Sequence, residues 1–236
     1  MKISLCIPMY NESDIIDGTL RTVSEYMRRT FEDYEVIFCD DGSTDDCRAK
    51  VEAFGDERIR AVGYSKNRGK GAAVRHAVMN AVGDIIIFTD CDLAYGLDVV
   101  HRVVGEFLKN KDADIVVGSR NLSKDGYEGY TLTRKMASKA YIKCLAFSVG
   151  FKMTDSQCGF KAFRLDTAHE IFRECTTDGF AFDIEVLLRA KKLGKKITEM
   201  PVKVVNHRQS KVNILSDSIK MLGQIRQIKR QIRSER

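Results

Sequence analysis

The sequence DIIIFTDCD, residues 84–92, decides the fold of this chain. Its run of apolar residues, Ile85–Phe88, predicts a strand that is covered on both faces, as strands of a parallel sheet are. Asp90 and Asp92 follow at the end of that strand, and alternate residues of an extended segment point the same way. Two carboxylates on one side favour a Mg²⁺ or Mn²⁺ site that substrate phosphates and water complete. A solvated turn is the alternative interpretation.

The same alternation of apolar runs and helical spacing continues on both sides of this strand. We expect strands at Ile3–Ile7, Val36–Cys39, Ile59–Tyr64, Asp84–Thr89 and Asp114–Gly118, separated by helices around 15–27, 45–54, 72–82 and 98–109. This order predicts an α/β fold with a mostly parallel sheet and helices on both faces. In such sheets ligands bind at the carboxyl ends of the strands, so the loops there are expected to carry the chemistry.

The second half of the chain is less regular. Its patterns predict helices at Leu132–Val149, Phe180–Leu193 and Ser216–Arg233, with a strand at Ile197–Val205. We therefore expect one domain over 1–212, with a regular half at 1–118 and a less regular half at 119–212. A basic amphipathic helix over 213–236 would follow it.

Charge and hydropathy argue against a membrane-spanning protein and place the positive charge at one end of the chain. The 236 residues carry a net charge of +6, and the positive charge lies in the tail: from Pro201 onward nine Lys or Arg stand against two acidic residues. That tail carries +7, so the first 200 residues carry −1. No N-terminal signal peptide is recognisable, and no stretch approaches the ~20 apolar residues that span a bilayer.

Cysteine usage points to a compartment. The seven cysteines are odd in number, form no CxxC pair, and several lie in apolar runs. This pattern indicates buried thiols in a reducing cytoplasm. It also argues against a zinc site, because none of the four histidines has ligand spacing with a cysteine.

Two further loops stand at expected strand ends. Asp40 and Asp41 open the sequence DDGS, and carboxylates there can accept hydrogen bonds from a ribose or a base edge. The loop SKNRGKG at 65–71 is basic and glycine-rich and leads into a helix, which suits phosphate binding. Neither GxxxxGK[ST] nor a GxGxxG after the first strand occurs, which weighs against ATPases and dehydrogenases.

The motifs, taken in order, resemble a known family. IPMYNE at 7–12, DDGSTD at 40–45, NRGKG at 67–71 and DCDL at 90–93 come in the order seen in family 2 glycosyltransferases of the GT-A fold, which has a Rossmann-like sheet. Gly118–Arg120, Arg134-Lys135, DSQCGFK at 155–161 and FAFDIE at 180–185 resemble a narrower group, the polyprenyl-phosphate hexose synthases. Within that group they are most similar to the dolichyl-phosphate glucose synthase-like branch.

The resemblance implies that 1–212 is a catalytic domain in which 1–118 holds the nucleotide sugar and 119–212 holds the acceptor. It also implies roles for individual residues. Those expected to bind the nucleotide sugar are Pro8, Tyr10, Glu12, Asp40, Asp41, Asn67, Lys70, Asp90, Cys91 and Asp92. Asp90 and Asp92 would hold the metal, and Ala94 stands where some mannose-transferring relatives carry a glutamine as a further metal contact. Those expected to receive the acceptor phosphate are Arg120, Arg134, Arg208 and Lys211. Asp155, Gln157 and Asp183 would lie on the acceptor side.

The reaction implied is transfer of a hexose, glucose from UDP-glucose, to a polyprenyl phosphate with inversion and with Mg²⁺ or Mn²⁺. Asp92, Arg120 and Arg134 would be the catalytic residues. A phosphate acceptor is mostly ionised at neutral pH and needs no strong base. A sugar hydroxyl acceptor, the first alternative, would need one, and Asp183 and Asp155 are the candidates.

Other interpretations stay open. GDP-mannose is an alternative donor, and a catalytically inactive nucleotide-sugar sensor is a further class. Arg120 and Arg134 are alternatively surface ion-pair partners. Asp183 and Glu185 alternatively form a solvated helix face, which we favour for that pair.

The C-terminal tail indicates where in the cell the protein acts. Met221, Ile225, Ile228 and Ile232 line one side of the last predicted helix, among basic residues, which favours a cytoplasmic protein held peripherally on a membrane surface. Alternatively, this helix packs on the domain, on a second subunit of a homo-oligomer or on a membrane protein partner. Nucleic acid is not expected as a partner, because no aromatic residues are interleaved with the basic ones.

Overall fold

The structure is a computed structural model that describes residues 1–126, 153–206 and 214–235, with side chains of the last segment described from 223. The helix expected at Leu132–Val149 lies outside the described residues. So do three expected phosphate-binding residues, Arg134, Arg208 and Lys211.

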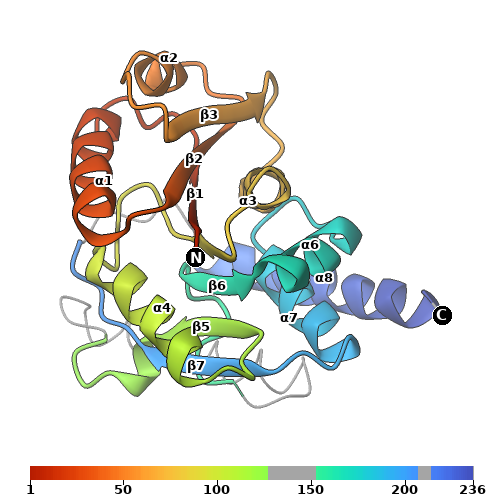
Figure 1. Cartoon of the computed structure of the whole chain (residues 1–236). Helices are drawn as coiled ribbons and strands as arrows, with labels where there is room; N and C mark the ends of the chain where they lie inside the picture. Colours follow the sequence, from red (N-terminus) through yellow and green to blue (C-terminus); the bar gives the residue numbers. More distant parts are fainter. Residues whose placement is uncertain (127–152, 207–213, 236) are drawn as a thin grey trace.

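One seven-stranded sheet forms the centre of the molecule (Figure 1). Its strands are β1 (Ile3–Met9), β2 (Tyr34–Asp41), β3 (Ile59–Tyr64), β4 (Ile85–Phe88), β5 (Ile115–Ser119), β6 (Lys161–Arg164) and β7 (Ile197–Pro201). Their order is β3-β2-β1-β4-β6-β5-β7, and every neighbouring pair is parallel except the two that involve β6. The expected mostly parallel α/β sheet is therefore confirmed.

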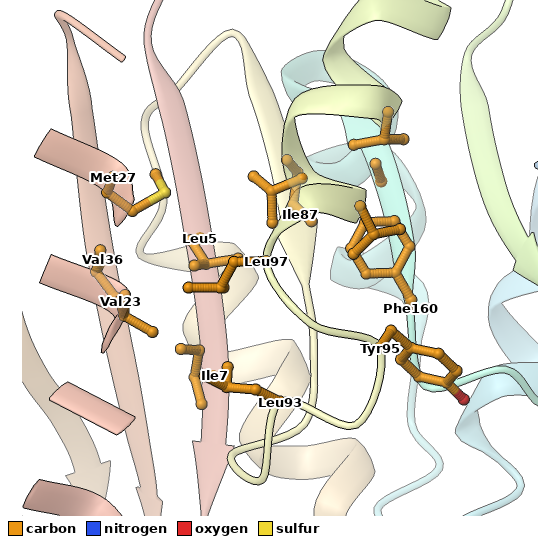
Figure 2. Packing of buried hydrophobic residues seen from close by; sticks show 14 of the residues in the cluster. Leu5, Ile7, Val23, Met27, Val36, Ile87, Leu93, Tyr95, Leu97 and Phe160 are labelled. Atoms are coloured by element: carbon orange, nitrogen blue, oxygen red, sulfur yellow. The ribbon is translucent and has the colours of Figure 1, made fainter. Parts of the chain in front are cut away.

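Helices cover both faces of the sheet, as expected. They are α1 (Ile16–Thr30), α2 (Cys47–Glu52), α3 (Lys70–Met79), α4 (Asp98–Lys109), α6 (Leu165–Glu174), α7 (Phe182–Lys192) and α8 (Ile214–Ser234), with a short 3-10 turn η1 (Arg120–Leu122). Apolar side chains of α1, α2 and α4 share one core cluster, those of α3, α6 and α7 share a second, and a smaller third cluster joins α7 to α8. In the first cluster Val23 and Met27 of α1 lie near Val36 of β2 (Figure 2).

The strand β6 and the helix α6 are absent from the sequence-based prediction. The sequence of β6 is KAFR, with a charged residue at each end, so the segment lacks the apolar run that marks the other central strands. Its lysine, Lys161, is nevertheless fully buried. The strand expected at Ile197–Val205 also ends earlier, at Pro201. Pairing of β6 with β4 and β5 brings the loop that precedes it against Asp90.

The C-terminal helix packs on the domain. Ile225 and Ile228 of α8 are buried against Ala181 and Ile184, where α7 begins. These two isoleucines therefore face the protein, and the expectation that they face a membrane is wrong. No helix in the described part of the chain is both long and apolar enough to cross a bilayer.

Candidate functional site

Most of the residues expected to bind the nucleotide sugar gather where β1, β2 and β4 end. Met9 of β1 pairs with Asp40 of β2, so the loops that follow these two strands start side by side. β4 is the other neighbour of β1 and leads into Asp90. The predicted position of these loops, at the carboxyl ends of parallel strands, is therefore confirmed.

The loops after β1 and β2 are tied together. The amide N–H of Asn11 donates to Ser43 Oγ at 3.0 Å, and the N–H of Thr44 donates to Asn11 Oδ1 at 2.8 Å. Asp40 is buried, and its Oδ1 accepts the N–H of Ser43 at 2.9 Å. These bonds fix the backbone on both sides of the Asp40 carboxylate.

Tyr10 projects from this pair of loops. Its side chain is 41% exposed, so the edge combines a fixed carboxylate with an exposed aromatic ring. Pro8 and Glu12 flank Tyr10 in the sequence, and both are partly exposed. All three expected residues of the first loop are thus accessible to a ligand.

Asp41 holds the basic loop rather than facing solvent. Its carboxylate accepts the Tyr64 hydroxyl at 2.7 Å and the Asn67 side-chain amide at 2.9 Å. The backbone N–H groups of Arg68 and Gly69 also donate to it, both at 2.9 Å. Burial, followed by the hydrogen bond to this carboxylate, raises the pKa of Tyr64. Asp41 and Asn67 therefore position the loop 65–69.

Lys70 reaches the carboxylate at the end of β4. It is the first residue of α3, and its ammonium forms an ion pair with Asp90. Although burial alone lowers the pKa of Lys70, the charges of Asp90, Asp183 and Asp92 raise it above its ordinary value. The lysine therefore stays positively charged beside the two carboxylates.

Asp92 completes the acidic pair. Its Oδ1 accepts the N–H of Ala94 at 3.0 Å, and burial followed by the charge of Asp90 raises the pKa of its carboxyl group. Two neighbouring, partly buried carboxylates favour a cation, and their oxygen donors fit Mg²⁺ or Mn²⁺. No group of three or more His, Cys, Asp or Glu that could hold a metal occurs among the described residues.

Cys91 differs from its two neighbours. Its side chain is buried in the apolar cluster that contains Ile7 and Leu93, while its carbonyl accepts the Thr19 hydroxyl at 2.9 Å. The thiol thus lies in the core rather than on the ligand side of the loop. The six described cysteines are all free and buried, as expected.

The loop 153–160 lies against Asp90. A Cβ added to Gly159 would collide with the Asp90 carboxylate, so any side chain there would displace that carboxylate. The ring of Tyr95 packs edge-on against Phe160, with ring centroids 6.5 Å apart (Figure 2). Gln157 lies on the same loop and is partly exposed. The loop expected on the acceptor side is therefore adjacent to the acidic pair.

Arg120 forms a two-point ion pair with Asp155 on this loop. Its Nε and Nη2 donate to the two carboxylate oxygens at 2.7 and 2.9 Å, and Asp155 is fully buried. The alternative of a surface ion pair is wrong for Arg120, because its partner lies inside the protein. The guanidinium is held in one orientation.

Asp183 and Glu185 do not form a solvated helix face. Asp183 is buried in an ion pair with Lys161, which also donates to the carbonyl of Cys158 at 2.8 Å. Glu185 is buried beside Arg189, with 2.9 Å between Oε1 and Nε. The expectation of solvation is wrong because each carboxylate has a buried cation as its partner.

Sequence reasoning does not single out Lys161, although this residue ends the motif DSQCGFK. A lysine inside a segment with no apolar run gives no signal of burial. The motif itself is the one feature that could have drawn attention to it.

Comparison with known proteins gives consistent results. The sequence model of the family described as "Glycosyl transferase family 2" matches residues 4–172. The dolichyl-phosphate beta-glucosyltransferase of Dictyostelium discoideum is 30% identical over 244 residues, covering 96% of this chain and 73% of the relative. The enzyme of the same name from Saccharomyces cerevisiae is 28% identical, covering 93% of this chain and 71% of the relative.

Solved structures show the same fold. Glucosyl-3-phosphoglycerate synthase from Mycobacterium tuberculosis, in complex with Mn²⁺, uridine diphosphate and phosphoglyceric acid, aligns with a TM-score of 0.71 at 22% identity. The alignment covers 96% of this chain and 76% of that chain. Mannosyl-3-phosphoglycerate synthase from Rubrobacter xylanophilus aligns with a TM-score of 0.68 at 19% identity, covering 100% of this chain and 75% of that chain.

Proposed function

Since this chain belongs to glycosyl transferase family 2 and is a glycosyltransferase with the GT-A fold, we propose that it transfers glucose from UDP-glucose to a polyprenyl phosphate. The observation that carries the proposal is the likeness to dolichyl-phosphate beta-glucosyltransferases, which covers 96% and 93% of this chain in two relatives. The geometry around Asp90 supports the same reaction.

The donor end of the reaction needs positive charge at a leaving diphosphate. Asp90 and Asp92 would hold Mg²⁺ or Mn²⁺, which supplies charge stabilisation to the departing nucleoside diphosphate. Structural neighbours bound to uridine diphosphate with Mn²⁺ or Mg²⁺ support this assignment. Lys70 places a further positive charge beside Asp90. We assign Asp40 and Tyr10 to the nucleoside.

At the acceptor, the reaction depends more on the orientation of the phosphate than on a general base. We assign Arg120, together with Arg134, to the acceptor phosphate, and Asp155 holds the Arg120 guanidinium ready for it. A phosphate oxygen is already ionised near pH 7 and attacks the anomeric carbon in line, which inverts its configuration. The two carboxylates that would serve as a base for a hydroxyl acceptor, Asp155 and Asp183, are both in buried ion pairs.

A transfer assay tests this proposal. Purified protein with Mn²⁺, polyprenyl phosphate in detergent and radiolabelled UDP-glucose is expected to move label into the organic phase, in the β configuration. GDP-mannose serves as the competing donor. Retention of the α configuration, or label that does not move into the organic phase, would overturn the proposal.

The exposed side of α8 supports peripheral contact with a membrane. With Ile225 and Ile228 packed on the domain, the exposed side chains include Arg226, Arg230 and Arg233. We assign this basic face to an anionic lipid surface on the cytoplasmic side, because each basic residue near such a surface contributes about 1 kcal/mol.

Replacing Arg226, Arg230 and Arg233 together by glutamine is expected to weaken binding to anionic vesicles roughly 100-fold, since three such contributions are lost. Vesicle co-sedimentation at low and high salt measures the effect. The matched control replaces Arg21, Arg28 and Arg29 on α1, which are also exposed, by glutamine. Equal losses in both variants would show that net charge, rather than the face of α8, controls binding.

A further inference from the structure

A buried arginine joins the last two helices. Arg189 of α7 is only 3% exposed, and its Nε donates to Glu185 Oε1 at 2.9 Å. Its two terminal nitrogens donate to the carboxylate of Glu235, just beyond α8, at 2.9 and 3.1 Å. Lys192 also donates to the Ile232 carbonyl at 3.1 Å. The end of α8 is therefore tied to α7 through one guanidinium that two carboxylates share.

Glu185 holds the segment that precedes α7. Its Oε2 accepts the N–H of Thr177 at 2.7 Å, and both of its oxygens lie 3.1 Å from the N–H of Thr176. These hydrogen bonds fix the start of the segment 176–179. Because the carboxylate that makes them is buried, it depends on Arg189 for its charge balance.

The segment 176–179 packs on the first turn of α3. The Asp178 carbonyl accepts the N–H of Ala72 at 3.2 Å, and its carboxylate pairs with Arg75 at 2.5 Å. A Cβ added to Gly71 would lie 2.5 Å from the Thr177 carbonyl oxygen, so the two backbones touch. Gly71 directly follows Lys70, whose ammonium pairs with Asp90.

We propose that Glu185 and Arg189 are positioning residues of the nucleotide-sugar site, and that Glu235 completes their arrangement from beyond α8. They act through residues 176–179 on the turn that carries Lys70. This role rests on the proposed function, which makes the edge around Asp90 the donor site. Docking of α8 then favours donor binding. If the first turn of α3 is already ordered, less conformational entropy is lost when the ligand binds.

Glu235→Ala tests the role with little risk to folding, since the residue is partly exposed and follows the last turn of α8. Hydrogen–deuterium exchange of the unliganded full chain is expected to speed up at residues 69–73 and 176–179. The dissociation constant for UDP with Mn²⁺ and the KM for the donor are expected to rise about five- to tenfold, with kcat within about twofold. Glu235→Asp is expected to restore part of the affinity.

Glu170→Ala is the matched control, because it removes another ion pair between separate elements, with Lys195 at 2.5 Å. Exchange at 69–73 that is the same in both variants overturns the inference, as does a fall in kcat with an unchanged KM. Failure of the natural chain to bind UDP would count against the proposed function, while the exchange comparison would still decide the positioning role.

Discussion

Asp92→Asn is expected to lower the rate of sugar transfer by about 10²–10³-fold, the usual effect of losing stabilisation of developing charge, because the metal that Asp92 is proposed to hold would bind less tightly. The amide keeps the shape of the side chain but cannot supply an anionic metal ligand. Burial and the charge of Asp90 raise the pKa of Asp92 and so disfavour its ionised form, and the variant is expected to fold at least as stably. Initial rates at saturating donor and Mn²⁺ measure the loss, and thermal unfolding checks the fold.

The control for this prediction is Asp84→Asn. Asp84 stands at the opposite end of the same strand, where it accepts the backbone N–H of Lys2 at 2.7 Å. Its replacement is expected to leave the transfer rate within about twofold, because no charge develops near it. An Asp92→Asn variant that keeps activity similar to Asp84→Asn would remove Asp92 from the reaction.

Lys161→Met is expected to destabilise the fold by about 3–5 kcal/mol, because it leaves the buried Asp183 without its adjacent cation. Such a loss is a large share of the roughly 5–15 kcal/mol that is typical of a folded domain. Urea unfolding at pH 7 measures it.

The pH dependence of this variant has a definite sign. Burial raises the pKa of Asp183 in the folded protein above its value in the unfolded chain. The folded state therefore binds the proton more tightly, and lowering the pH through that raised pKa favours folding. The loss in free energy of unfolding caused by Lys161→Met is therefore expected to shrink as the pH is lowered from neutral toward the ordinary carboxyl range. Urea unfolding at several pH values measures this change.

The double variant Lys161→Met, Asp183→Leu separates charge from packing. It is expected to recover most of the lost stability, because an apolar pair replaces the ion pair without leaving a buried charge. Lys195→Met removes a partly exposed pair instead and is expected to cost about 0.5 kcal/mol or less. A double variant as unstable as the single one would place the loss in packing rather than in charge.

Part of the site follows from local sequence. Asp90, Asp92 and Asp40 could be placed because each stands at the end of an apolar run, and such a run marks a strand. The order of those runs was enough to predict a parallel sheet. These signals are contained within about ten residues, so no knowledge of distant partners is needed.

Other features depend on burial that the local sequence does not reveal. Lys161, Asp183, Glu185 and Arg189 are charged, and charged residues are assigned to solvent unless a counter-charge is known. The pair Lys161–Asp183 forms only when β6 and α7 pack together. Glu185 and Arg189 stand four residues apart on α7, and only the folded domain buries them. Docking of α8 was unpredictable for a similar reason, since an amphipathic pattern reveals an apolar face but not what covers it.

The position of β6 has a consequence for the chain as it is synthesised. β4 is complete at Phe88, yet one of its edges stays unpaired until residues 161–164 are inserted between it and β5. At roughly 5–20 residues per second, a ribosome needs about 4–15 s to make the intervening segment. Throughout that interval the nascent chain presents an unpaired apolar edge, which is a template for aggregation. Slower translation between Phe88 and Arg164 would lengthen the time for which this edge is exposed. Holdase chaperones would be able to bind the nascent chain during that interval.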